Sequence, residues 1–282
     1  MNALISLGFL LFAWLPTAAA QMIYPEAVYR IPAPAGGLPS SEAPSHPGVF
    51  MVAALGDSVT AGVASVVLGE NPRSNFSTGD DGTIWSHAAM LQQHLPHLHV
   101  RTINTAISGA TSDDLIRQAQ VASTYVPDYA TILIGVNDAC SDNIQRAMDL
   151  QRYVHNVSMA AAILIRANPA VRIRLIPAPS LRQMHSISSQ KLACRVKWSL
   201  SRSCRAFTSP PHVTSEKENF FRLVDAYNAA LTNIANMHPG NVTVAWKVSM
   251  IQLNPQDISS IDCFHPSAEG QRKLAWMSFG DL

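Results

Sequence analysis

The chain has 282 residues and a mass of 30.5 kDa, which is enough for one large domain or two small ones. Its 20 Lys and Arg residues balance 19 Asp and Glu residues, and a net charge of +1 argues against a nucleic-acid partner, because phosphate backbones require a clustered basic surplus. Apolar residues make up 48% and charged residues 14% of the chain, which excludes an intrinsically disordered protein. Beyond the N-terminus no apolar run approaches the ~20 residues that span a bilayer, so a multi-pass membrane protein is also excluded.

Residues 1–20 are predicted to be a secretory signal peptide. An apolar run from Ala3 to Leu15 ends at Pro16, and three alanines directly before Gln21 supply the small residues of a cleavage site. An uncleaved membrane anchor is the alternative. We therefore expect a secreted protein, found outside the cell or in the lumen of the secretory pathway.

Residues 21–48 form a proline-rich lead-in that can hold neither a helix nor a central strand. From residue 49 onward, continuous apolar runs alternate with amphipathic segments, a pattern typical of a parallel sheet covered by helices on both faces. Residues 49–282 are therefore predicted to be one α/β domain. The expected strands are 49–55, 99–103, 131–135, 171–176 and 242–248, and the expected helices are 85–94, 112–123, 143–167, 215–237 and 267–279.

Residues 180–215 interrupt this alternation and are predicted to be a long irregular loop, which in a compact domain is commonly a lid or a binding loop. The segment contains two of the four cysteines and no Asp or Glu. Solvent exposure is favoured over lipid contact for its basic side chains, because charge runs usually face solvent. These basic residues are Arg182, Lys191, Arg195, Lys197, Arg202 and Arg205.

An even number of cysteines suits an oxidising compartment, and because none forms a CxxC pair, a zinc ribbon or a thioredoxin-like site is not expected. The residue pattern leaves three pairings open among Cys140, Cys194, Cys204 and Cys263. Three sequons add candidate glycosylation sites at Asn75, Asn156 and Asn241.

Chemically competent residues follow the predicted strands, and ligands of an open parallel sheet bind beyond the carboxyl ends of its strands. Ser58 is expected to end the first strand and open a helix whose N-terminus favours developing negative charge. A serine nucleophile needs a base, for which His265 is suited, and Asp262 can orient that imidazole. The backbone amides of Ser58 and Gly109 and the side-chain amide of Asn137 would supply donors for an oxyanion.

Four sequence blocks in this order resemble the GDSL or SGNH hydrolase superfamily over residues 50–270. They are Gly56-Asp57-Ser58, the glycine at 109, Gly135-Val136-Asn137-Asp138 and Asp262-Cys263-Phe264-His265. Within the superfamily the chain most resembles the phospholipase B-like group, on the segments Ala53–Gly62, Asn137–Cys140 and Asp262–His265 and on Cys194 with Cys204.

The resemblance implies a three-layer α/β/α sandwich, similar to flavodoxin, with a five-stranded parallel sheet. It assigns Ser58, Asp262 and His265 as the catalytic residues and Ser58, Gly109 and Asn137 as the oxyanion hole, with no metal and no cofactor. Asp138 is expected to shape the turn that aims Asn137. The implied substrate is a lipid ester or a lysophospholipid, with peripheral contact at a membrane surface and a monomeric protein. The alternatives are a carbohydrate acetylesterase of the same superfamily, with a shallow polar cleft, and a noncatalytic SGNH-like binding protein.

For the disulfides we expect Cys194 to pair with Cys204, because the two are close in a segment with no expected regular structure and would close a loop of about ten residues. Cys140 would then pair with Cys263 and join the loop after Asn137 to the loop before His265. Such a bond would hold two catalytic loops against each other.

Overall fold

The computed structural model describes residues 44–140, 149–201, 204–209 and 214–280. Contacts divide the chain into Met1–Ile31 and Pro32–Leu282, and the described residues all belong to the second unit. The expected signal peptide (1–20) and most of the lead-in (21–48) lie outside the described residues. Among the helices of the described ranges, none is both long enough and apolar enough to cross a membrane.

Five parallel strands form one sheet in the order β2-β1-β3-β4-β5. Central β1 and β3 are buried along almost their whole length, as expected for strands covered on both faces. Their register pairs Gly56 with Leu133, so both strands end at the same level of the sheet. The strands are β1 (Val49–Gly56), β2 (His99–Asn104), β3 (Tyr129–Leu133), β4 (Arg172–Leu175) and β5 (Val242–Val244).

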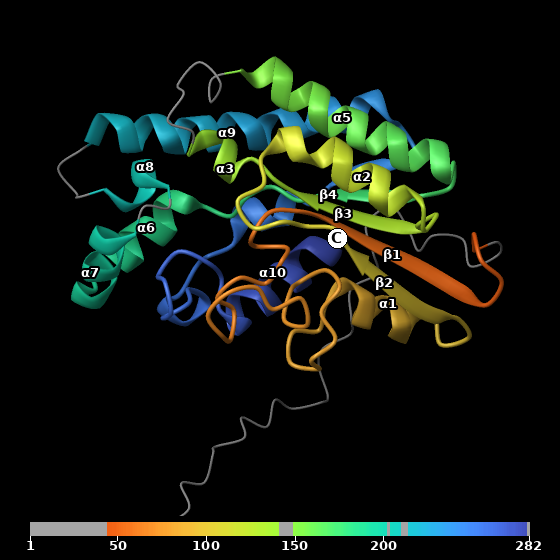
Figure 1. The fold of residues 1–282 in the computed structure, drawn as a ribbon, viewed down its shortest axis with the longest axis horizontal. Coiled ribbons are helices and arrows are strands. Elements are labelled where there is room, and N and C mark those ends of the chain that lie inside the picture. The colour runs from red at the N-terminus through yellow and green to blue at the C-terminus, as the bar shows by residue number, and fades with distance from the viewer. Residues whose placement is uncertain (1–43, 141–148, 202–203, 210–213, 281–282) are drawn as a thin grey trace, which may run out of the picture. The chain divides into compact units, whose positions relative to one another are not determined.

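Helices cover the two faces of the sheet as separate layers (Figure 1). One layer contains α2 (Leu115–Ser123), α5 (Leu150–Ala167) and α9 (Thr214–Met237), and the other contains α1 (His87–His94) and α10 (Ala268–Phe279). The apolar stripe of α5 explains its position, because Val157, Ala160, Ala161 and Leu164 recur at helical spacing and are all fully buried. The expected three-layer α/β/α sandwich with a five-stranded parallel sheet is confirmed.

The layer of α1 and α10 is attached to the sheet through buried polar groups. The ring of His87 hydrogen-bonds the Tyr129 hydroxyl at 2.8 Å and the Ser278 hydroxyl at 2.7 Å, and Arg174 on β4 donates to the Ser278 carbonyl at 2.9 Å. Burial, with the nearby Arg174 charge, lowers the pKa of His87 to about 3. His87 is therefore a neutral structural residue that joins α1, β3 and α10.

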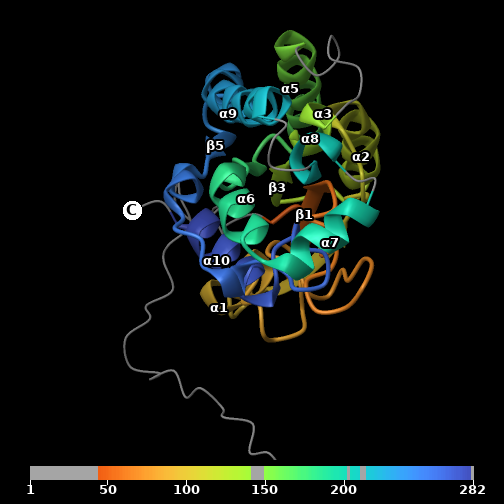
Figure 2. The ribbon, with the colours of Figure 1, turned by 90° about the vertical axis from the view of Figure 1, so that its left-hand side faces the viewer.

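The expected irregular loop over residues 180–215 is wrong, because its described part forms three helices: α6 (Leu181–Ser189), α7 (Leu192–Leu200) and α8 (Arg205–Thr208). Figure 2 turns these helices toward the viewer. Ser180 begins α6 by accepting a hydrogen bond from the Gln183 amide at 3.2 Å, a standard N-cap. Aromatic rings give the segment a small core of its own, since Trp198 packs on His185 and Phe207 with centroid distances of 5.5 and 5.2 Å.

The expected disulfide pairing is also wrong. Cys140 pairs with Cys204, and Cys194 pairs with Cys263, with Cα–Cα distances of 4.8 and 5.5 Å. The reason is the helix that the sequence analysis missed: α7 holds Cys194 on its buried face and carries the chain about 9 Å along its axis before Cys204 is reached. Each bond therefore joins the α6–α8 segment to the main domain, and neither joins the segment to itself.

Two of the three predicted glycosylation sites do not fit the folded chain. Asn75 is 0% and Asn156 6% exposed, and their side-chain amides donate to the Pro72 carbonyl at 2.6 Å and to Asp113 at 2.8 Å. A glycan on either nitrogen would displace these contacts from the protein interior. Asn241 also donates, to the Pro169 and Val171 carbonyls at 2.9 Å, but its side chain is partly exposed, and this site stays a prediction.

Candidate active site

Ser58 lies directly beyond the tip of β1. The chain leaves the strand at Gly56, whose φ is +151° and where a Cβ would lie 2.3 Å from the Leu133 carbonyl, so only glycine allows this close passage beside β3. The expected helix at Ser58 is wrong, since residues 57–64 form successive turns, with the Val63 amide donating to the Ser58 carbonyl at 2.9 Å. Ser58 therefore does not stand at the N-terminus of a helix.

Hydrogen bonds join the three candidate catalytic side chains in one line. The Ser58 hydroxyl lies 2.7 Å from Nε2 of His265, and Nδ1 of the same ring lies 2.5 Å from Asp262 Oδ2. An ionised carboxylate only accepts hydrogen bonds, so Nδ1 carries the proton and Nε2 is left to accept from the serine. This is the arrangement in which an imidazole can take a proton from the nucleophile.

Asp262 is held in its ionised form. Burial alone favours the neutral carboxyl, but the hydrogen bond to His265 and the backbone amides of Phe264 and His265, at 3.0 and 3.1 Å from Oδ1, lower its pKa below the usual range. A carboxylate fixed by backbone donors cannot rotate away from the imidazole. The loop therefore fixes both the charge and the direction of Asp262.

Asp57, the neighbour of Ser58, has a raised pKa, in contrast to Asp262. Its side chain is buried, and burial raises its pKa to about 6, although the Val59 amide, which donates to it at 3.0 Å, partly opposes the shift. Asp57 stabilises the turn after β1 through this contact. It does not lie in the line of hydrogen bonds from Ser58 to Asp262.

The candidate oxyanion donors lie on two loops that contact each other. Asn137 on α3 (Val136–Ala139) donates one side-chain hydrogen to the Ala110 carbonyl at 2.9 Å, which leaves its second hydrogen available. Gly109 precedes Ala110 with φ of +80°, a left-handed conformation that favours glycine. Within the described ranges, the backbone amides of Ser58 and Gly109 donate to no other protein group.

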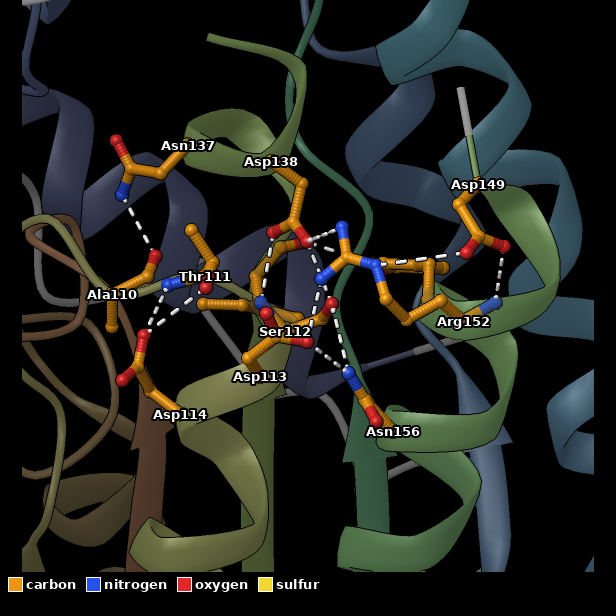
Figure 3. A network of polar contacts seen from close by, with 12 residues as sticks. Ala110, Thr111, Ser112, Asp113, Asp114, Asn137, Asp138, Asp149, Arg152 and Asn156 are labelled. Carbon is orange, nitrogen blue, oxygen red and sulfur yellow. Dashed lines mark hydrogen bonds and ion pairs between the residues drawn. The ribbon is translucent and has the colours of Figure 1, made fainter. Parts of the chain in front are cut away.

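A buried polar network holds these two loops together (Figure 3). Asp138, next to Asn137, accepts from the Ser112 amide at 2.8 Å and from its hydroxyl at 2.6 Å. Arg152 of α5 lies 2.5 Å from Asp113 and 3.8 Å from Asp138, and Asn156 also donates to Asp113. Burial raises the pKa of Asp138, while the Ser112 hydrogen bonds and the Arg152 charge oppose the shift. The expectation that Asp138 shapes the turn at Asn137 agrees with this geometry.

An apolar pocket opens beside Ser58 and His265. Its volume is about 30 Å³, and it lies between the tips of β3 and β4, the helix α6 and the loop of His265. Its apolar walls include Leu133, Val136, Ala178, Leu181, Met184 and Phe264. A carbon chain is the group that such walls would desolvate favourably.

Hydrogen bonds join Ser58, His265 and Asp262, and Asn137 lines the pocket beside Ser58 and His265. Gly109 is adjacent in the chain to Ala110, whose carbonyl accepts from Asn137. Sequence reasoning missed the pocket residues Leu181 and Met184. Their spacing of three positions, directly after the helix-capping residue Ser180, could have indicated the buried face of a helix. Arg152 was also missed, and nothing in its local sequence marks it. In the described ranges, no group of three or more His, Cys, Asp or Glu side chains could hold a metal ion.

Two solved structures share the fold with low sequence identity. One is described as a GDSL-like lipase from Parabacteroides merdae, with 18% identity, a TM-score of 0.53, and coverage of 81% of this chain and 93% of that chain. The other is the lipase Lip_vut3 from a goat rumen metagenome, with 15% identity, a TM-score of 0.55, and coverage of 82% and 98%. A search of curated proteins gave no match.

The family comparison covers most of the described domain. Residues 54–273 match the GDSL-like Lipase/Acylhydrolase family, a range that begins inside β1, ends inside α10 and contains every candidate site residue. The sandwich fold and the order of the four sequence blocks agree with that match, and the chain belongs to the GDSL-like lipase/acylhydrolase family of ester hydrolases.

Proposed function

We propose that this protein is a secreted serine esterase that hydrolyses acyl ester bonds of lipids, in the manner of a phospholipase B or lysophospholipase. The observation that carries the proposal is the line of hydrogen bonds from Ser58 through His265 to Asp262. Among the described residues, the backbone amides of Ser58 and Gly109 have no protein acceptor, which leaves them available to an oxyanion. Secretion is supported by the apolar N-terminal segment and by two disulfides.

In the proposed reaction, the Ser58 oxygen attacks the ester carbonyl while Nε2 of His265 takes its proton. The carbonyl oxygen becomes an oxyanion that the amides of Ser58 and Gly109 and the free hydrogen of Asn137 stabilise. His265 then donates the proton to the departing alcohol, which leaves an acyl group on Ser58. Water, deprotonated by His265, hydrolyses this acyl-enzyme and restores the serine. Asp262 stabilises the imidazolium in both steps.

The apolar pocket favours an acyl group as the part of the substrate held next to Ser58. Its volume of about 30 Å³ is far below the roughly 300–1,000 Å³ of a typical ligand pocket, so it is too small to enclose a long acyl chain. This small volume also favours a second candidate, a carbohydrate acetylesterase, whose acyl group is no longer than two carbons.

One substrate series separates the two candidates. We expect rates of p-nitrophenyl ester hydrolysis to be retained from acetate to longer acyl chains, together with release of fatty acid from lysophosphatidylcholine. Hydrolysis of acetylated polysaccharide and of p-nitrophenyl acetate, with none of lysophosphatidylcholine, would replace the lipid substrate by a carbohydrate ester.

Ser58→Ala tests the nucleophile. The variant is expected to fold, because the hydroxyl contributes little packing, and to lose both ester hydrolysis and labelling by a fluorophosphonate. A folded Ser58→Ala protein with near-wild-type turnover would remove the serine mechanism, and a wild-type protein inert toward every ester would support the noncatalytic alternative.

A further inference from the structure

Helix α7 has two apolar faces, and among the described residues one is buried against the protein and the other is exposed. Cys194 and Trp198 are 3% and 5% exposed and form the inner face. Leu192, Val196 and Leu200 recur every four residues on the opposite side and are 67%, 51% and 81% exposed. Single exposed apolar residues are ordinary, but a continuous outer stripe on one helix is typical of a surface that contacts something apolar.

Cations flank this stripe on both sides. At 100° per residue, Arg195 and Lys197 lie on either edge of the Leu192–Val196–Leu200 stripe. The side chains of Arg195 and Lys197 donate to the backbone carbonyls of Ser189 and Ser260, and within the described ranges neither forms an ion pair with a carboxylate. No Asp or Glu occurs from residue 180 to 215. An apolar helix face edged by cations is the pattern of a helix lying in the headgroup region of an anionic lipid surface.

The helix is attached to the loop that carries the candidate base. Cys194 is bonded to Cys263, which lies between Asp262 and His265, and Lys197 contacts the Ser260 carbonyl. Aromatic contacts continue the attachment, since Phe207 packs on both Trp198 and Phe264 with centroid distances of 5.2 and 4.9 Å. The position of α7 is therefore fixed relative to the catalytic loop.

A second exposed apolar segment contacts the same loop. The Ser259 hydroxyl donates to the Ala64 carbonyl at 2.6 Å, and the Ala268 amide donates to the Ser65 carbonyl at 3.0 Å. Directly after these residues, Val66, Val67 and Leu68 are 46%, 52% and 85% exposed. Figure 2 shows α7 and the orange segment that follows β1 on the side of the molecule facing the viewer. Exposed apolar side chains thus come from both segments that hold the loop of Asp262 and His265.

We propose that the outer face of α7, assisted by Val66–Leu68, binds an anionic phospholipid surface and brings the site to the plane where lipid esters lie. This inference rests on the proposed function, because membrane binding would serve a lipid substrate. It concerns the outer face of α7, which is separate from the candidate active site. Apolar side chains would enter the acyl boundary, and Arg195 and Lys197 would contact the headgroup phosphates.

The test is vesicle flotation with the full-length mature protein. We compare vesicles of phosphatidylcholine with vesicles that also contain phosphatidylglycerol. The variant carries Leu192→Gln, Val196→Gln and Leu200→Gln, because glutamine keeps helix propensity. The matched control carries Val121→Gln, Met159→Gln and Met237→Gln, three exposed apolar residues on α2, α5 and α9.

We expect the wild type and the control variant to float with the anionic vesicles and the α7 variant to bind them at least about tenfold more weakly. Arg195→Gln with Lys197→Gln should weaken binding about fivefold for each charge on anionic vesicles only, in a salt-dependent way. Hydrolysis of soluble p-nitrophenyl acetate should be unchanged in the α7 variant and in the control variant, which shows that they are folded. The fold of the charge variant is checked by circular dichroism instead, because Lys197 contacts the Ser260 carbonyl of the catalytic loop.

Equal vesicle binding by the α7 variant, the control and the wild type would overturn the proposal. So would a wild-type dimer in analytical ultracentrifugation that becomes monomeric in the α7 variant, because the stripe would then bind a second copy of the chain. If the proposed function fails instead, soluble ester hydrolysis is absent while vesicle binding still depends on α7, so the two failures are distinguishable.

Discussion

Two adjacent residues, Asn137 and Asp138, have different roles in the candidate site. Asn137 keeps a free hydrogen on its side-chain amide, whereas both carboxylate oxygens of Asp138 are used by Ser112. The second residue fixes the backbone from which the first projects. Asp138 is therefore a positioning residue whose effect should appear in the rate of the chemical step.

Asp138→Asn is expected to lower kcat about tenfold for a soluble ester with little change in KM. The amide has one acceptor oxygen for the two Ser112 donors and no charge to attract Arg152, so the contact between the loops of Asn137 and Gly109 weakens. Full loss of an oxyanion donor costs more, about 10²–10³ in kcat. Steady-state kinetics measures the effect. The control is Asp149→Asn, which lies 3.9 Å from the same Arg152 but is 47% exposed. Equal kcat in the two variants would contradict the positioning role.

Asp57 gives a prediction about stability and pH. Because its pKa rises from 3.8 to about 6 on folding, the folded protein binds this proton more tightly than the unfolded chain. The free energy of unfolding should therefore fall as the pH rises through that interval. Asp57→Asn removes the charge and should be more stable than the wild type at pH 7, by roughly 3 kcal/mol at most, with no advantage below about pH 4. Urea unfolding at both pH values tests this, and an identical pH dependence in both proteins would contradict it.

The sequence alone predicted the site residues that belong to short, recognisable sequence motifs. Ser58 follows a strand, and Asp262 and His265 are three positions apart, so each belongs to a short recognisable block. Arg152 has no such block. Its place in the network depends on how α5 packs beside α2, which no local pattern encodes.

The same distinction holds for whole elements. The strands were predicted to within a few residues because β1 and β3 are largely apolar, and because β4 has apolar residues on both sides of its two arginines. The helices α6 and α7 were missed because each is short and its few apolar residues are interspersed with serines and basic residues. Their inner faces also pack mainly on each other and on α8, and these contacts are not visible in the local sequence. The error in the disulfides follows from this one omission, since only a helix separates Cys194 from Cys204.

The bond between Cys194 and Cys263 makes the α6–α8 segment part of the catalytic loop. The double variant Cys194→Ser with Cys263→Ser should lose about 4 kcal/mol of unfolding free energy, given a sequence separation of 69 residues. It should also show a lower kcat, because the Asp262–His265 loop loses its attachment to α7. Chemical denaturation and soluble-ester kinetics measure the two effects.

Dithiothreitol provides the control for this variant. Mild reduction of the wild type should reproduce the loss of kcat, whereas the double variant should respond less. A double variant with wild-type stability and kcat would mean that the loop keeps its geometry without the bond.

For the whole molecule, the proposed secretory route predicts that residues 1–20 are removed and that all four cysteines are oxidised. Expressed with residues 1–20 in a secreting eukaryotic cell, the protein should appear in the medium beginning at Gln21 and without free thiols. Residues 21–282 produced in a reducing cytosol should contain four alkylatable cysteines and unfold at lower denaturant concentration. Intact mass after alkylation measures both. Retention in the membrane fraction with residues 1–20 present would favour the anchor alternative.

The cross-links also have a consequence for the order of events during synthesis. Along the chain, the first cysteine pairs with the third and the second with the fourth, so the two covalent loops are interleaved. A chain that enters an oxidising compartment N-terminus first offers Cys194 to Cys140 before the correct partner, Cys204, has arrived. Closing that early pair would leave Cys204 with Cys263, and only thiol–disulfide exchange could then restore the native connectivity. Maturation of this hydrolase should therefore depend on a disulfide isomerase.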